Sequence, residues 1–285
     1  LEGFLNNRGV YSYSEGNNLS DFIDDNDLND QTYLPFSVLS RKDDNGSVEF
    51  FAVDLNTSSR ENLKLSPNDV VFVFSQYDID FINSALLADA LGLLTEEEKK
   101  KIDTLYGSLG SDPLKKSLSK NTMSIANKNE LDKKGFVKFI PGDRYPCKSL
   151  KYVAKFNAST LISNLKSLEF SSSETDISDR LGLNEGCPKI FEDNPGLLII
   201  ALENASLLSG EVRKPGFYPV TKNLNLKNLT SFAGGATNLG ISGSYEIFYS
   251  EEDIKNIDYV EANNLLSTKK FPKSIVLQQD PDKQE

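Results

Sequence analysis

Carboxylates are the residues of this chain whose type and number could support catalysis. Its 42 Asp and Glu residues would allow two carboxyl groups to flank a glycosidic bond, as in a glycosidase. Adjacent acids occur at Asp24-Asp25, Asp43-Asp44 and 251–253, but each run falls in an expected loop or turn, where solvated charge is the simpler interpretation. Residues 24–30 could form a calcium loop, yet they lack the ligand spacing of an EF-hand. We therefore rank a carboxylate glycosidase below a non-catalytic function.

The rest of the composition removes most other kinds of site. The chain has no His, so Ser-His-Asp and Cys-His catalysis are excluded and the commonest zinc ligand is missing. Its two cysteines, Cys147 and Cys187, cannot build a structural zinc site alone. They could form a disulfide or stay two unrelated buried thiols. A net charge of −11 argues against nucleic acid, whose phosphates require clustered Lys and Arg. We expect no cofactor and no metal.

A pattern of residues that occurs twice in the sequence predicts the structural elements that would position a functional site. The copies are offset by 207 residues, and a duplicated folding unit is the economical explanation. We favour a structural role for each matched residue, because turns require the glycines and cores require the tyrosines. The matched pairs are Leu1 and Leu208, Gly3 and Gly210, Gly9 and Gly216, Tyr11 and Tyr218, and Leu19 and Leu226.

The first copy predicts a small unit of strands with one short helix. A strand up to Phe4 turns back into a second strand through residues 10–13, and a helix follows Asn18, which is a good cap. Residues 37–41 and 48–53 alternate on either side of Asn45-Gly46, which predicts a hairpin. A buried strand up to Phe74 closes the unit.

The second copy predicts a similar order of elements. A strand through Leu208 and Val212 meets a turn at Pro215-Gly216, and residues 217–220 form the return strand. A helix from Leu226 to Phe232 ends at Gly234-Gly235, which we interpret as a C-terminal cap. A phosphate site there is disfavoured, because neither the Rossmann fingerprint nor a Gly-Lys-Ser/Thr loop is present. Further strands are expected at 245–249, 257–260 and 273–278.

The segment between the copies differs from them in its pattern of residues and is predicted to be mainly helical. Apolar residues recur at helical spacing over 80–94 and 157–170, and Thr95 and Pro195 are good helix starts. One strand is expected at 135–140, and residues 107–134 are expected to form a loop. The whole chain is therefore predicted to be α+β.

The residues of the repeat resemble a known module. Residues 210–220, with Leu226 and 233–237, resemble the soluble-ligand-binding β-grasp (SLBB) module of polysaccharide export outer-membrane proteins. Residues 1–19 and 65–70 resemble a divergent second copy, with Arg8 where the family has Pro. Residues 187–203 are similar to multi-module members. The resemblance implies β-grasp modules at 1–76 and 205–285, joined by a helical segment at 77–204.

The resemblance also implies a function. Members are non-catalytic scaffolds or conduits that form homo-oligomeric rings in the periplasm, associated with the outer membrane. They contact the polysaccharide in transit and an inner-membrane polysaccharide copolymerase component. We expect this chain to be a piece of a longer protein whose contact with the membrane is made by other regions. Because the resemblance implies an oxidising compartment, we favour a Cys147–Cys187 disulfide, which would contribute on the order of 4 kcal/mol in the chain-entropy model.

The main alternative is a periplasmic or extracellular module that binds a soluble ligand or carbohydrate, since related β-grasp modules do so in other settings. Sugars commonly stack on Trp, and the chain has none, although Tyr and Phe could replace it.

Overall fold

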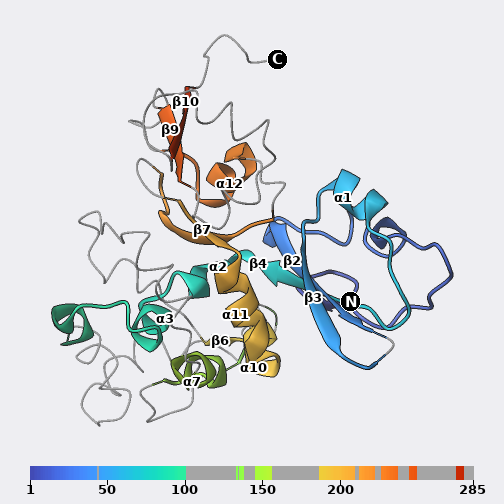
Figure 1. Cartoon of the computed structure of the whole chain (residues 1–285), viewed down its shortest axis with the longest axis horizontal. Helices are drawn as coiled ribbons and strands as arrows, with labels where there is room; N and C mark the ends of the chain where they lie inside the picture. The colour runs from blue at the N-terminus through green and yellow to red at the C-terminus, as the bar shows by residue number, and fades with distance from the viewer. Residues whose placement is uncertain are drawn as a thin grey trace. The chain divides into compact units, whose positions relative to one another are not determined.

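The structure is a computed structural model that describes residues 1–43, 45–100, 133, 135–137, 145–155, 186–208, 212–221, 226–236, 244–248 and 274–278. Helices and several small sheets are both present (Figure 1), which confirms the α+β class. The chain divides into two compact units, Leu1–Leu208 with Gly216–Phe232, and Ser209–Pro215 with Ala233–Glu285. Within the described ranges, no helix is long and apolar enough to cross a membrane.

A four-stranded sheet forms the amino-terminal part of the first unit. Its order is β1 (Glu2–Gly3), β4 (Val70–Ser75), β2 (Thr32–Lys42) and β3 (Val48–Val53). The β1–β4 pair is parallel, and the other two pairs are antiparallel. The β2–β3 hairpin confirms the prediction from Asn45-Gly46, and Gly46 has the positive φ of 82° that such a turn requires.

A hydrophobic core lies under one face of this sheet. Strands β2 and β4 bury most of their side chains, whereas β3 is exposed along nearly all of its length. The core is covered by η1 (Leu19–Asp21) and α1 (Thr57–Asn62). Burying each large aliphatic side chain contributes roughly 1.5–3 kcal/mol. The core residues are Leu5, Leu19, Ile23, Leu39, Leu55, Val71 and Val73.

The predicted return strand at residues 10–13 is wrong. These residues are not in a strand, and the side chain of Val10 is fully exposed. A strand at a sheet edge is stabilised by side chains that pack on the core. No side chain from Val10 to Tyr13 is buried, so the segment gains no such packing.

The middle of the chain is mostly helical where it is described. The expected helix over 80–94 is two helices, α2 (Gln76–Ile82) and α3 (Ala85–Ala90), because Asn83 ends the first and the Ser84 side chain caps the second. The later helices are α7 (Lys148–Lys155), α10 (Lys189–Asp193) and α11 (Pro195–Glu203). The expected helix at 157–170 lies outside the described residues, as does the loop expected at 107–134 apart from Lys133.

Two short ladders complete the first unit. β5 (Phe136–Val137) pairs antiparallel with β6 (Cys187–Pro188), within the strand expected at 135–140. β7 (Ala205–Leu208) pairs antiparallel with β8 (Gly216–Pro219), which confirms the return strand of the second copy. α12 (Leu226–Phe232) follows, as expected.

The second unit is described only in part. The N–H groups of Arg213 and Lys214 donate to the carbonyls of Gly235 and Ala233, and Val212 forms an isolated bridge with Ala236. Val212 is therefore not part of β7. β9 (Ser244–Phe248) pairs antiparallel with β10 (Ser274–Gln278), so the partner of β9 is the last strand. Residues 257–260 lie outside the described ranges.

Candidate functional site

A half-open groove of about 550 Å³ lies in the first unit, beside the start of the chain. We call it the amino-terminal groove. Its walls come from β1 and the loop after it, from Asn29, from the start of α2, from α10 and the residue that follows it, and from residues just before β5. The lining residues are Leu1, Glu2, Gly3, Phe4, Leu5, Asn6, Arg8, Gly9, Asn29, Ser75, Asp78, Lys133, Gly135, Lys189, Ile190, Asp193 and Asn194.

Asp78 is the buried ionisable group of this groove. Ser75 and Asp78 form a capping box at the start of α2, in which the Ser75 backbone N–H and Oγ donate to Asp78 Oδ2 at 2.6 and 2.8 Å. No donor in the described part of the chain reaches Oδ1. Desolvation raises the pKa of Asp78 to about 6, although the two bonds from Ser75 oppose the shift. The Ser-x-x-Asp pattern could have revealed the cap, but nothing in the sequence indicated the groove.

The rim of the groove combines both signs of charge with side-chain amides. Arg8, Lys133 and Lys189 are exposed cations, and Glu2 and Asp193 are exposed acids. Asn6, Asn29 and Asn194 add groups that both donate and accept hydrogen bonds. Such a rim can bind a ligand that is rich in hydroxyl groups.

Aromatic side chains continue from the wall of the groove. Phe4 meets Tyr77 edge to face at 6.2 Å between ring centroids, and Tyr77 meets Phe136 at 5.9 Å. Edge-to-face contacts of this kind add about 0.5–1.5 kcal/mol beyond simple burial. They fix β1, α2 and β5 around the groove.

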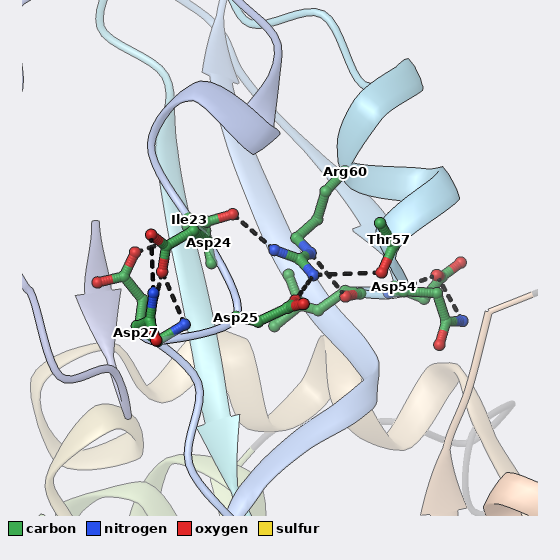
Figure 2. A network of polar contacts seen from close by, with 10 residues as sticks. Ile23, Asp24, Asp25, Asp27, Asp54, Thr57 and Arg60 are labelled. Carbon is green, nitrogen blue, oxygen red and sulfur yellow. Dashed lines mark hydrogen bonds and ion pairs between the residues drawn. The ribbon is translucent and has the colours of Figure 1, made fainter.

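The acidic loop after η1 is held by a buried arginine (Figure 2). Arg60 of α1 is only 4% exposed. Its Nε and Nη1 donate to the carbonyls of Leu55 and Ile23 at 3.0 and 2.7 Å, and its Nη2 pairs with Asp25. The cation therefore ties α1 to the loop, and no sequence signal singled it out.

The neighbouring carboxylates of this loop also bind the backbone. Asp24 Oδ1 accepts from the N–H groups of Asn26 and Asp27 at 2.7 and 3.1 Å, and the bonds from Asn26 lower the pKa of Asp24. At the β2–β3 turn, Asp43 Oδ1 likewise accepts from the N–H groups of Asn45 and Ser47. These acids therefore shape loops. Asp44 and residues 251–253 lie outside the described ranges.

The calcium loop considered at residues 24–30 gains no support from the geometry. Among the described residues, the single group of three acids or cysteines with converging ligand atoms is Cys147, Cys187 and Glu192. Its two sulfur atoms are bonded to each other. This group is therefore a structural cluster.

The Cys147–Cys187 disulfide is present, as favoured by the resemblance. The two Cα atoms are 5.7 Å apart, and both side chains are fully buried. Glu192 of α10 accepts from the backbone N–H groups of Lys148 and Ser149, each at 2.9 Å. Disulfide and carboxylate together fix the start of α7 against α10.

The matched residues of the first copy lie in unlike surroundings. Gly3 pairs with Val73 in the β1–β4 ladder, Gly9 lies in an open loop and Leu19 is fully buried. Tyr11 is 41% exposed and donates from its hydroxyl to the Asn7 carbonyl. The tyrosine of this copy is therefore not a core residue.

In the second copy Tyr218 is buried and Gly216 begins β8. Pro215 precedes that strand, and Leu226 is the first residue of α12. Gly234 and Gly235 have φ values of 79° and 88°, as the C-terminal cap requires. Gly210 lies outside the described residues.

The side chain of Asn83 holds the second copy in place, and sequence reasoning did not find it. The Phe217 N–H donates to Asn83 Oδ1 at 2.6 Å, and Asn83 Nδ2 donates to the Phe217 carbonyl at 2.8 Å. A Cβ at Gly216 would lie 2.2 Å from the same Oδ1. This turn glycine is thus explained by a close contact from α2.

No family model, curated protein or solved structure matches this chain.

Proposed function

We propose that the chain is the periplasmic part of an outer-membrane polysaccharide export protein, in which it acts as a non-catalytic scaffold or conduit. The observation that carries the proposal is the order of the four-stranded sheet. In a β-grasp fold the first and last strands are parallel neighbours, and a hairpin extends the sheet beyond the last strand. β1 and β4 are such a parallel pair, and β2–β3 is such a hairpin.

The sheet departs from a β-grasp at one position. A β-grasp has a return strand next to its first strand, and residues 10–13 are not in a strand here. The buried disulfide supports the proposed compartment independently, because such bonds persist in oxidising environments. The partners in this proposal are further copies in a ring, the polysaccharide in transit and an inner-membrane polysaccharide copolymerase.

Electron microscopy of the full-length protein in detergent tests this function. We expect ring-shaped particles, and we expect cells that lack the protein to retain polysaccharide in the periplasm. A protein that stays monomeric with all its domains present, or a deletion strain that exports normally, would contradict the proposal.

The amino-terminal groove favours one second candidate, a module that binds a soluble carbohydrate. A volume of about 550 Å³ suits a small ligand, and the amides and charges of the rim match sugar hydroxyls. Titration of defined oligosaccharides by calorimetry tests it. We expect Asn29→Ala or Lys189→Ala to weaken binding about tenfold, which corresponds to the loss of roughly one hydrogen bond. Lys42→Ala, an exposed lysine of β2, is the matched control. Equal losses in all three variants would argue against the groove.

A further inference from the structure

Strand β3 is an unprotected edge of the four-stranded sheet. It is last in the strand order, and β2 is its neighbour on one side (Figure 1). Its side chains are exposed on both faces, including Val48 at 45%, Phe50 at 49% and Phe51 at 40%. The strand contains no Pro or Lys, which natural proteins use to block edge pairing, and Glu49 is its single charged residue. An exposed apolar edge of this kind is typical of an association surface.

The hairpin register shows which backbone groups of β3 are available. The Asp43 N–H donates to the Ser47 carbonyl at 2.9 Å, so this pair is hydrogen-bonded. Pairs alternate along an antiparallel ladder, and Val48 pairs with Lys42 in the next position. The N–H and C=O groups of Val48, Phe50 and Ala52 therefore point away from β2. Those of the intervening residues bond to β2.

We infer that β3 pairs antiparallel with β3 of a second copy of this chain, about a two-fold axis at Phe50. In this register Val48 faces Ala52 of the other copy, and Phe50 faces its own equivalent. All three outward-facing residues of each strand then find partners. The two Phe50 rings lie on the same face of the joined sheet, where cross-strand aromatic pairs are favourable.

Charge and burial together select this register over its neighbours. Moving the axis to Glu49 would place the two Glu49 carboxylates opposite each other, and like charges directly opposite are destabilising. Moving the axis to Phe51 would place Val48 opposite Asp54. Asp54 lies outside the strand and is only 5% exposed, so Val48 would have no strand partner. With the axis at Phe50, Glu49 faces Phe51 and no like charges meet within the ladder. The strand is therefore complementary to itself.

This contact goes beyond the proposed function. A two-fold contact joins identical surfaces, whereas a ring is closed by a head-to-tail contact between different surfaces. The two proposals can therefore fail separately. Loss of edge pairing would leave rings of the full-length protein intact.

The mass of the 285-residue chain in solution tests the contact. We expect light scattering to report 31.6 kDa at low concentration and a rise toward twice that mass as concentration increases. Phe50→Pro removes an outward-facing N–H without removing a bond to β2, and should hold the mass at the monomer value. Tyr152→Lys on α7, which changes an aromatic residue of similar exposure, should dimerise as the wild type does. A wild type that stays monomeric, or a Phe50→Pro variant that still dimerises, would overturn the inference.

Hydrogen exchange on the unmodified chain gives a test that needs no substitution. The amides of Phe50 and Ala52 should become protected as concentration rises, whereas those of Glu49 and Phe51 should be protected at every concentration. Protection of Phe50 and Ala52 that appears only after another protein or peptide is added would show that the occupant is not a second copy. Phe50→Cys should also form a disulfide-linked dimer on mild oxidation, and Val48→Cys should not. Equal cross-linking of both variants would contradict an axis at Phe50.

Discussion

The two copies of the repeated pattern have the same residues at matched positions but different structures. In the first copy, β1 pairs parallel with β4, the chain after Gly9 forms no strand, and Tyr11 is exposed. In the second copy, β7 and β8 form an antiparallel hairpin and Tyr218 is 2% exposed. A short motif of glycines and tyrosines therefore permits a strand–turn–strand unit but does not impose one.

The difference lies in what each copy contacts. Helix α2 approaches both copies within the first unit, and its two ends carry different side chains. At its start, Asp78 lies in the groove beside the first copy. At its end, Asn83 binds both backbone groups of Phe217 in the second copy. The hydroxyl of Tyr33 also donates to the Pro219 carbonyl at 2.9 Å. These partners stabilise the second return strand, and the first copy has no equivalent of them in the described residues.

The largest difference is expected at the matched tyrosines. Tyr218→Ala removes a buried ring and should lower the free energy of unfolding by about 3–5 kcal/mol. Tyr11→Ala removes a ring that is 41% exposed and packs on Phe22, so the loss should be about 1 kcal/mol or less. Urea unfolding followed by circular dichroism measures both. Equal losses would show that the two copies are folded alike after all.

Two glycines within the first copy, Gly3 in β1 and Gly9 in the loop after it, should differ next in their effect on stability. A Cβ at Gly3 would lie 2.0 Å from the Val73 carbonyl oxygen, and φ is +95°. Gly3→Ala must therefore push β1 away from β4, at a cost of about 3 kcal/mol. Gly9→Ala has a positive φ but open space around it, so we expect about 1 kcal/mol. The same unfolding experiment compares the two variants. A Gly3→Ala variant as stable as Gly9→Ala would show that β1 is not part of the sheet.

The contribution of α2 to stability should depend on pH beside the first copy but not beside the second, because Asp78 can ionise and Asn83 cannot. The pKa of Asp78 is raised on folding to about 6, so the folded state holds this proton more tightly than the unfolded state. Its contribution to stability is therefore greatest below pH 4 and falls as pH rises to about 6. Between pH 4 and pH 7 the wild type should lose on the order of 2 kcal/mol more than Asp78→Asn. Both proteins contain the same other carboxyl groups, so the contributions of those groups cancel in the comparison. Parallel curves of stability against pH would show that the pKa of Asp78 is not raised.

Local signals in the sequence predicted what local contacts determine. Asn45-Gly46 predicted the β2–β3 hairpin, and Pro195 predicted the start of α11, because turn and cap preferences act within a few residues. The predicted return strand of the first copy failed because a strand needs a partner, and no local signal supplies one. The Asn83–Phe217 contact joins residues 134 apart, and the groove joins segments even further apart. Neither contact has a sequence pattern of its own.

The smallest effect is expected from the contact between α2 and the second copy, and it tests the cause of the difference directly. Gly216→Ala should be destabilising while Asn83 is present, because the new Cβ would meet Oδ1 at 2.2 Å. In an Asn83→Ala background that clash is absent, so the second substitution should cost less. We expect a coupling energy of about 1 kcal/mol from the four unfolding curves of this double-mutant cycle. Gly9→Ala in place of Gly216→Ala is the matched control, because no atom lies within 4 Å of its Cβ. If the losses of stability from Asn83→Ala and Gly216→Ala were additive, the return strand β8 would be stabilised by other neighbouring segments and not by α2.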